Sequence, residues 1–260
     1  MANPEGSFIW YELMTPDPDA SRAFYGAVMG WTIDAQPMGD MDYRMIAAPD
    51  GHVGGVMRLT PEMQAGGARP IWLGYLGVED VDATAAKAKA AGGSVMMPGW
   101  DIPGIGRLAM VADPQGAPFY LMRPIPPADD PDATSHAFAP ESPGHVAWNE
   151  LSSTDHKAAL VFYAALFRFE NNEIMSMGEM GDYAFIDHHG VRIGAAMTMK
   201  DMPAMWRFYW LVPSVSAAAT AITSGGGMVV HGPTEVPGGQ HVIVAADPHG
   251  AMFGVVGALN

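Results

Sequence analysis

The sequence of 260 residues lacks cysteine and has few basic side chains. Without cysteine it can form no disulfide, no thiolate nucleophile and no cysteine-ligated zinc site. It contains 13 Lys and Arg residues and 28 Asp and Glu residues, which gives a formal net charge of −15. This charge argues against nucleic acid or an anionic membrane as a partner. No apolar run approaches the roughly 20 residues that span a bilayer, and residues 1–8 have no signal-peptide pattern. We therefore expect a soluble, cytoplasmic protein.

What the sequence does contain is an internal repeat. In the first part of each half, Trp10–Leu13 matches Trp148–Leu151, and Phe24-Tyr25 matches Phe162-Tyr163 at the same offset. At a second constant offset, further pairs match: Trp72 and Trp206, Tyr75 and Tyr209, Gly92-Gly93 and Gly226-Gly227, and Asp113-Pro114 and Asp247-Pro248. Two offsets indicate that each half consists of two units joined by a connector of variable length.

The segment between the halves is rich in Pro and Asp and poor in large apolar residues, which is typical of a linker. We predict a first domain over 1–124, a linker over 125–143 and a second domain over 144–260.

Each half reads as two units of strand, helix and three strands. In the first unit, Asp17 and Pro18 predict a helix start and Gly30 its end. The predicted strands of the first half are Ile9–Thr15, Trp31–Gln36, Tyr43–Ala48, Val53–Leu59, Trp72–Val78, Ser94–Met97, Leu108–Ala112 and Pro118–Arg123, with a second helix over Val81–Ala91. The Gly- and Pro-rich stretches 98–106 and 233–239 are interpreted as mobile lids or as plain connectors. Asp17, Asp113 and Asp247 are interpreted as turn or cap residues.

Four such units resemble the vicinal oxygen chelate superfamily, which contains glyoxalases, bleomycin-resistance proteins and extradiol dioxygenases. The residues that carry the likeness are Thr15-Pro16-Asp17, Phe24-Tyr25-Gly26, Gly30-Trp31, Ala90–Gly93 and Asp113–Gly116, with their counterparts in the second half. The resemblance implies an α+β fold, in which four βαβββ units pair into two half-closed barrel (cup) domains. It also implies that the two domains can pair within a monomer, or that the chain forms a homodimer.

The family holds a metal ion inside the cup with His, Glu or Gln side chains. Counting from the repeated motifs places its ligand positions at Trp10, Trp148, Leu73, Arg207, Tyr120 and Gly254. Divalent metals need converging carboxylates, imidazoles or amides, and this set does not provide them. We therefore expect no metal and no other cofactor. The histidines offer no alternative, since His145 and the pair His188-His189 are interpreted as strand-start and solvated turn residues.

Alternation along the strands suggests what lines the cups instead. The predicted catalytic residues are Glu12, Glu150, Tyr75 and Tyr209, and the predicted ligand-binding residues are Trp10, Met14, Met57, Leu73, Tyr120, Trp148 and Arg207. A carboxylate among aromatic rings is a candidate general acid or base. Alternatively, the two glutamates satisfy backbone amides or pair with an arginine such as Arg207. The 21 methionines indicate either a Met-rich core or an adaptable apolar pocket.

Three functions remain open from the sequence. The first is a metal-independent enzyme that acts on a small carbonyl or aromatic compound by carboxylate acid–base chemistry. The second is a non-catalytic protein that sequesters an apolar, aromatic or cationic drug or metabolite. The third is a metal-dependent lyase or dioxygenase with relocated ligands.

Overall fold

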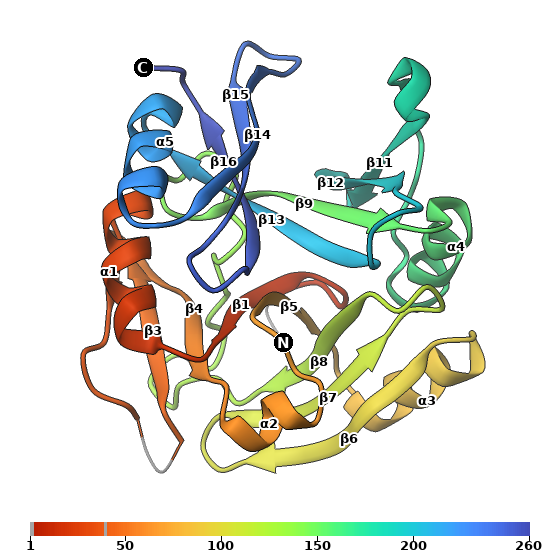
Figure 1. Ribbon diagram of the computed structural model, residues 1–260. Coiled ribbons are helices and arrows are strands. Elements are labelled where there is room, and N and C mark those ends of the chain that lie inside the picture. The colour runs from red at the N-terminus through yellow and green to blue at the C-terminus, as the bar shows by residue number, and fades with distance from the viewer. Residues whose placement is uncertain (1–2, 39–40) are drawn as a thin grey trace. The chain divides into compact units, whose positions relative to one another are not determined.

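The computed structural model describes residues 3–38 and 41–260 (Figure 1). The first half contains β1 (Phe8–Thr15), α1 (Pro18–Met29), β2 (Thr32–Ile33), β3 (Tyr43–Ala48), β4 (Gly51–Arg58), α2 (Pro61–Ala65), β5 (Ile71–Gly77), α3 (Val81–Ala90), β6 (Ser94–Ile102), β7 (Gly106–Ala112) and β8 (Pro118–Pro124). The second half contains β9 (Val146–Ser153), α4 (His156–Phe167), β10 (Ile174–Ser176), the 3₁₀ helix η1 (Gly178–Met180), β11 (Asp182–His188), β12 (Val191–Thr198), β13 (Met205–Val212), α5 (Val215–Ser224), β14 (Met228–Glu235), β15 (His241–Ala246) and β16 (Met252–Gly257).

The strands form two eight-stranded mixed sheets, one from each half of the sequence. Their orders are β2-β3-β4-β1-β5-β8-β7-β6 and β10-β11-β12-β9-β13-β16-β15-β14. The predicted α+β class and the four repeats are confirmed, and the sheets are consistent with paired half-barrels. The short elements α2 and η1 were not predicted.

The chain folds into two compact units that do not follow the two halves. One unit contains 3–9, 74–135 and 149–206, and the other contains 10–73, 136–148 and 207–260. Each unit therefore combines one repeat from each half of the sequence. In the unit that contains Trp10, α1 packs against α5, as Figure 1 also shows, and in the other unit α3 contacts α4. The predicted boundaries at 124 and 144 stay a prediction.

The helix ends follow the predicted chemistry. Asp17 Oδ1 accepts a hydrogen bond from the Ala20 backbone N–H at 3.0 Å, Pro18 occupies the first turn, and Gly30 ends α1 in the left-handed conformation with φ +74°. Asp80 and Ser214 cap α3 and α5 in the same way. Such caps satisfy backbone N–H groups that the first helical turn leaves without partners.

A Trp–Tyr–Asp chain of hydrogen bonds joins the two repeats of each compact unit. In one unit Trp206 Nε1 donates to the Tyr163 hydroxyl at 2.8 Å, and that hydroxyl donates to Asp113 Oδ2 at 3.3 Å. Asp113 Oδ1 accepts from two backbone N–H groups of its own turn, at 115 and 117. The predicted turn role of Asp113 is thus confirmed. Its second carboxyl oxygen, Oδ2, also binds Tyr163 of the other half of the sequence.

The other unit contains the same arrangement. Trp72 Nε1 donates to the Tyr25 hydroxyl at 2.9 Å, which donates to Asp247 Oδ2 at 3.1 Å. Burial raises the pKa of Tyr25 well above its usual value, so the phenol keeps its proton and remains a donor. The residues that revealed the repeat are therefore those that connect one half of the sequence to the other.

The paired glycines of the repeat have a related purpose. A Cβ at Gly93 would lie 3.0 Å from the Phe162 ring, and one at Gly227 would lie 2.8 Å from the Phe24 ring. Each glycine thus admits an aromatic ring from the opposite half of the sequence, which adds buried apolar contact to the hydrogen-bonded chain.

The interpretation of 98–106 and 233–239 as lids or connectors was wrong for 98–102 and for 233–235, which lie in strands. β6 continues to Ile102 and β14 to Glu235, both as outer strands of their sheets. The pairing register shifts between Met97 and Trp100 and between His231 and Thr234. Edge strands accept Pro at such bulges, because no ladder hydrogen bond is lost on the open side.

No helix in 3–38 or 41–260 combines the length and hydropathy that a bilayer span requires.

Replacing Tyr163 with Phe removes the hydroxyl between Trp206 and Asp113. We expect the free energy of unfolding to fall by about 2 kcal/mol, because a buried donor and a buried acceptor lose their partner together. Urea denaturation measures it, and Tyr25→Phe is the matched variant in the other unit. A loss below about 0.5 kcal/mol in both variants would contradict the structural role.

Burial raises the pKa of Asp113 above its usual 3.8, although backbone N–H groups and Tyr163 oppose the shift. The folded protein therefore binds more protons at this site than the unfolded chain, and the contribution to stability falls as pH rises above 3.8. We expect the stability advantage of the wild type over Asp113→Asn to shrink over that range. Denaturant titrations at several pH values would show it, and an advantage that grows with pH would contradict it.

Candidate functional site

One face of the first sheet carries the first predicted carboxylate. In the parallel pair β1 and β4, Glu12 lies opposite Gly55 and Met14 opposite Met57. Side chains alternate along a strand, and partners in register point to the same face. Trp10, Glu12, Met14 and Met57 therefore share the face away from the buried Tyr11 and Leu13. The Glu12 side chain is only 2% exposed.

A tyrosine that the sequence did not single out joins this face. The Trp10 indole N–H donates to the Tyr43 hydroxyl at 2.7 Å. Tyr43 lies opposite Met57 in the antiparallel pair β3 and β4, and its ring crosses Gly55 so closely that a Cβ at Gly55 would overlap the hydroxyl and the ring. Because Gly55 has no side chain, the Tyr43 ring can pack flat against the sheet over Gly55, which is the residue that pairs with Glu12.

The second half has an equivalent tyrosine, Tyr183, next to its glutamate. Glu150 lies opposite Ala195 in the pair β9 and β12, and Tyr183 lies opposite Met197 in the pair β11 and β12. The Tyr183 hydroxyl donates to Glu150 Oε2 at 2.9 Å. Ala195 has a Cβ where the first half has Gly55, and the tyrosine hydroxyl here meets the carboxylate. Glu150 is 6% exposed.

The remaining predicted residues of the first half lie in strands of both compact units. Tyr75 and Tyr120 face each other across the parallel pair β5 and β8, with ring centroids 4.4 Å apart, and Trp100 lies 6.1 Å from Tyr120. These three rings belong to one compact unit, and the buried Leu73 belongs to the unit of Trp10 and Glu12.

The second half places three predicted residues in the unit that contains Trp10. Tyr209 lies opposite Gly254, and a Cβ at Gly254 would overlap its ring. Trp148 packs against a cluster of Tyr209, Val244 and Val256. Arg207 is also buried, at 7% exposed. The other residues of this cluster and those packed on it are mostly aliphatic, among them Leu211 and Val242.

Tyr43 and Tyr183 are the site residues that sequence reasoning missed. A signal existed, since each tyrosine begins an alternating strand that is followed by a turn with one glycine, Gly51 in the first half and Gly190 in the second. The resemblance to the family points instead to the first and last strands of each unit, where the family's ligands lie.

The histidines take structural positions. His145 is buried and bridges the His136 carbonyl at 2.6 Å and Asp50 Oδ1 at 2.7 Å, as expected for a structural residue. For His188 the expectation of a solvated side chain was wrong, because its Nε2 donates to the Glu5 carbonyl and burial lowers its pKa. His189 is exposed, as expected.

Comparisons with known proteins assign the family. Residues 7–121 match the model of the Glyoxalase/Bleomycin resistance protein/Dioxygenase superfamily. A putative glyoxylase, CFP32 of Mycobacterium tuberculosis, is 30% identical over 257 residues, which cover 97% of this chain and 95% of that protein. The chain belongs to this superfamily, which is also called the vicinal oxygen chelate superfamily. The anthracycline biosynthesis protein DnrV of Streptomyces peucetius is 28% identical over 269 residues, which cover 96% of this chain and 93% of that protein.

Solved structures of the superfamily share the fold. The Mn(II)-bound glyoxalase of Novosphingobium aromaticivorans aligns with a TM-score of 0.63 at 19% identity, over 99% of this chain and 83% of that chain. The 2,3-dioxygenase LapB of Pseudomonas sp. KL28 aligns with a TM-score of 0.66 at 14% identity, over 99% and 94% of the two chains.

The superfamily implies a metal ion, and the side chains present do not fit one. The positions counted from the repeat hold Trp, Leu, Arg, Tyr and Gly, none of which supplies the carboxylate or imidazole set that a divalent ion requires. Within the described parts of the chain, no three His, Asp or Glu side chains gather in a way that could hold a metal ion.

We expect Gly55→Ala to lift Tyr43 from the sheet and to break its hydrogen bond with Trp10, because the new Cβ would overlap the ring. The indole N–H resonance of Trp10, assigned with Trp10→Phe, should move upfield and exchange faster with solvent. Ala195→Gly, at the equivalent position of the second half, is the control and should leave this resonance in place. An unmoved resonance in Gly55→Ala would contradict the account.

Proposed function

We propose that this protein is a metal-independent enzyme that acts on a small carbonyl or aromatic compound, with Glu12 and Glu150 as the proton-transferring groups. The observation that carries the proposal is that each compact unit has one buried glutamate on a strand where the family holds a metal ligand, Glu12 in one unit and Glu150 in the other, while the family's ligand positions hold side chains that do not suit a metal ion.

The chemistry follows from the side chains. A carboxylate next to a bound α-hydroxycarbonyl compound can remove the proton from the hydroxyl-bearing carbon and return it to the former carbonyl carbon, while the hydroxyl proton passes to the former carbonyl oxygen, which isomerises the compound through an enediolate. Negative charge that develops on the carbonyl oxygen requires a hydrogen-bond donor. Phenolic hydroxyls are suitable donors, since they remain protonated at neutral pH.

Four tyrosines are candidates for that donor. Tyr75 and Tyr209 keep the role that the sequence predicts for them. Tyr43 and Tyr183 are added by their positions on the faces of Glu12 and Glu150, and Tyr183 already donates to the Glu150 carboxylate. A hydroxyl that donates to the carboxylate in the resting protein can fix its orientation and then follow the charge when a proton moves.

Aromatic side chains and methionines favour a flat, partly apolar substrate. Indole and phenol rings stack on flat ligands, and Met14 and Met57 adapt to varied apolar shapes. The relatives named as anthracycline biosynthesis proteins point the same way, because anthracyclines are flat, fused-ring molecules.

Replacing Glu12 and Glu150 with Gln, singly and together, tests the proposal. We expect the double variant to abolish exchange of substrate C–H hydrogen with D₂O, followed by NMR across a panel of small α-hydroxycarbonyl and phenolic compounds. Glu79→Gln, an exposed carboxylate outside the site, is the control and should retain the wild-type rate. Exchange that persists in the double variant would exclude carboxylate catalysis.

Elemental analysis of the purified protein and dialysis against a chelator test the alternative, a metal-dependent reaction with relocated ligands. The proposal predicts full exchange activity in protein dialysed against a chelator. Activity that is lost on dialysis and restored by a divalent metal would overturn the metal-independent mechanism.

Binding without catalysis is the second candidate, favoured by the half-buried Trp148 side chain, which packs against the cluster of Tyr209, Val244 and Val256. A sequestering protein would bind a flat aromatic compound, lose affinity on Glu12→Gln, and form no product. Calorimetry with product analysis by NMR on the same samples separates the two candidates.

A further inference from the structure

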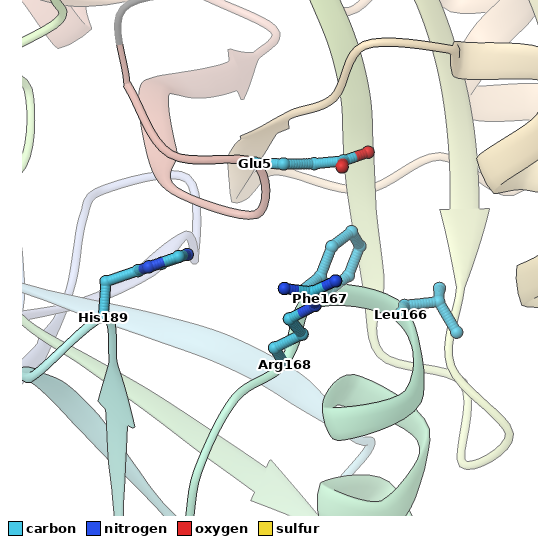
Figure 2. Close-up of a pocket in the computed structure, with 5 residues that line it drawn as sticks. All are labelled: Glu5, Leu166, Phe167, Arg168 and His189. Carbon is cyan, nitrogen blue, oxygen red and sulfur yellow. The ribbon is translucent and has the colours of Figure 1, made fainter.

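A cleft whose lining includes neither Glu12 nor Glu150 is formed by Glu5, Leu166, Phe167, Arg168 and His189 (Figure 2). Its volume of about 170 Å³ is several times the roughly 30 Å³ that one water molecule occupies in the liquid. The cleft can therefore admit a small organic molecule. All five residues belong to one compact unit.

Arg168 occupies a backbone position that normally belongs to glycine. It ends α4 in the left-handed conformation with φ +58°, and its N–H bonds the Ala164 carbonyl. The equivalent position that ends α1 is Gly30, with φ +74°. A side chain at such a position costs free energy relative to glycine. The backbone of Arg168 is therefore strained, and this strain accompanies a guanidinium at the end of α4.

His189 is the other non-glycine residue with positive φ among the residues described, at +49°. It precedes Gly190 in the tight turn between β11 and β12, and such turns favour Asn or Gly at this place. Both strained side chains thus line the same cleft. Strain of this kind is typical of functional sites when the surrounding structure maintains it.

The wall opposite these residues is fixed. The Glu5 carbonyl accepts a hydrogen bond from His188 Nε2 at 3.0 Å. Gly6, with φ +91°, packs so closely on Phe167 that a Cβ would lie 2.7 Å from the Phe167 Cβ. The Gly6 N–H also bonds the Gly77 carbonyl at 2.8 Å. The cleft is therefore built from ordered backbone on both sides.

Charge and shape identify the ligand class. In Figure 2 the His189 side chain extends toward the side of the cleft where Arg168 lies, the Arg168 side chain runs up to the Phe167 ring, and the carboxyl end of Glu5 points away from His189. Within the part of the chain that the structure describes, Arg168 forms no ion pair. A guanidinium fork matches a planar carboxylate, and Leu166 and Phe167 supply an apolar wall. We propose that this cleft binds a small organic carboxylate, with its charged end between Arg168 and His189.

Titration of the full chain with sodium benzoate at constant ionic strength tests the proposal, followed by NMR of the Arg168 and His189 side chains. We expect saturable shifts with a Kd of about 1 mM. Arg168→Gly should weaken binding at least tenfold while the melting temperature stays equal or rises, because it restores the glycine found at Gly30. Glu5→Gln should tighten binding by removing a nearby negative charge.

Arg22→Ala, which removes an exposed arginine of α1, is the charge-matched control and should bind benzoate like the wild type. Absence of saturable shifts in the wild type, or unchanged affinity in Arg168→Gly, would overturn the proposal. Inorganic phosphate that binds as tightly as benzoate would overturn the assignment to an organic carboxylate.

Discussion

The hydrogen-bonded chain from tryptophan through tyrosine to aspartate is the constraint on which the rest of the structure depends. In each compact unit the tyrosine comes from one half of the sequence and the aspartate from the other. The aspartate also closes its own turn by accepting two backbone N–H groups. One buried carboxyl group thus fixes both a local turn and a contact between distant residues, which are more than 200 positions apart for Tyr25 and Asp247. The strands that carry Glu12 and Glu150 are held in place by this framework.

Much of the fold could be predicted because the same motifs occur in both halves of the sequence, so each element is indicated twice. Asp17, Pro18 and Gly30 predict α1 through local cap chemistry, and Tyr43–Ala48 alternates as a half-buried strand. The errors have physical reasons. Pro98 and Pro233 read as loop residues, but an outer strand tolerates them at bulges. His188 looked solvated next to Gly190, yet long-range contact with the Glu5 carbonyl buries it.

The candidate site was less predictable than the fold. Alternation correctly places Trp10, Glu12 and Met14 on one face, since it depends only on the strand period. It cannot reveal that the Tyr43 hydroxyl accepts a hydrogen bond from Trp10, or that the Tyr183 hydroxyl donates one to Glu150. Both bonds join side chains of different strands, β1 with β3 and β9 with β11, so they depend on how the strands pack. The role of Arg168 is likewise not evident from the sequence, because only the backbone angle shows that it takes the left-handed position that Gly30 occupies in the first half.

Each compact unit draws its strands from both halves of the sequence, and this has a consequence for how the chain assembles. If the backbone were cut within 125–143, neither fragment would contain both the tyrosine and the aspartate of any one hydrogen-bonded chain. The fragments would have to find each other before either could complete its interior, so folding would become a second-order association that depends on concentration. In the intact chain the segment 125–143 joins the two halves covalently, which replaces that encounter with an intramolecular one.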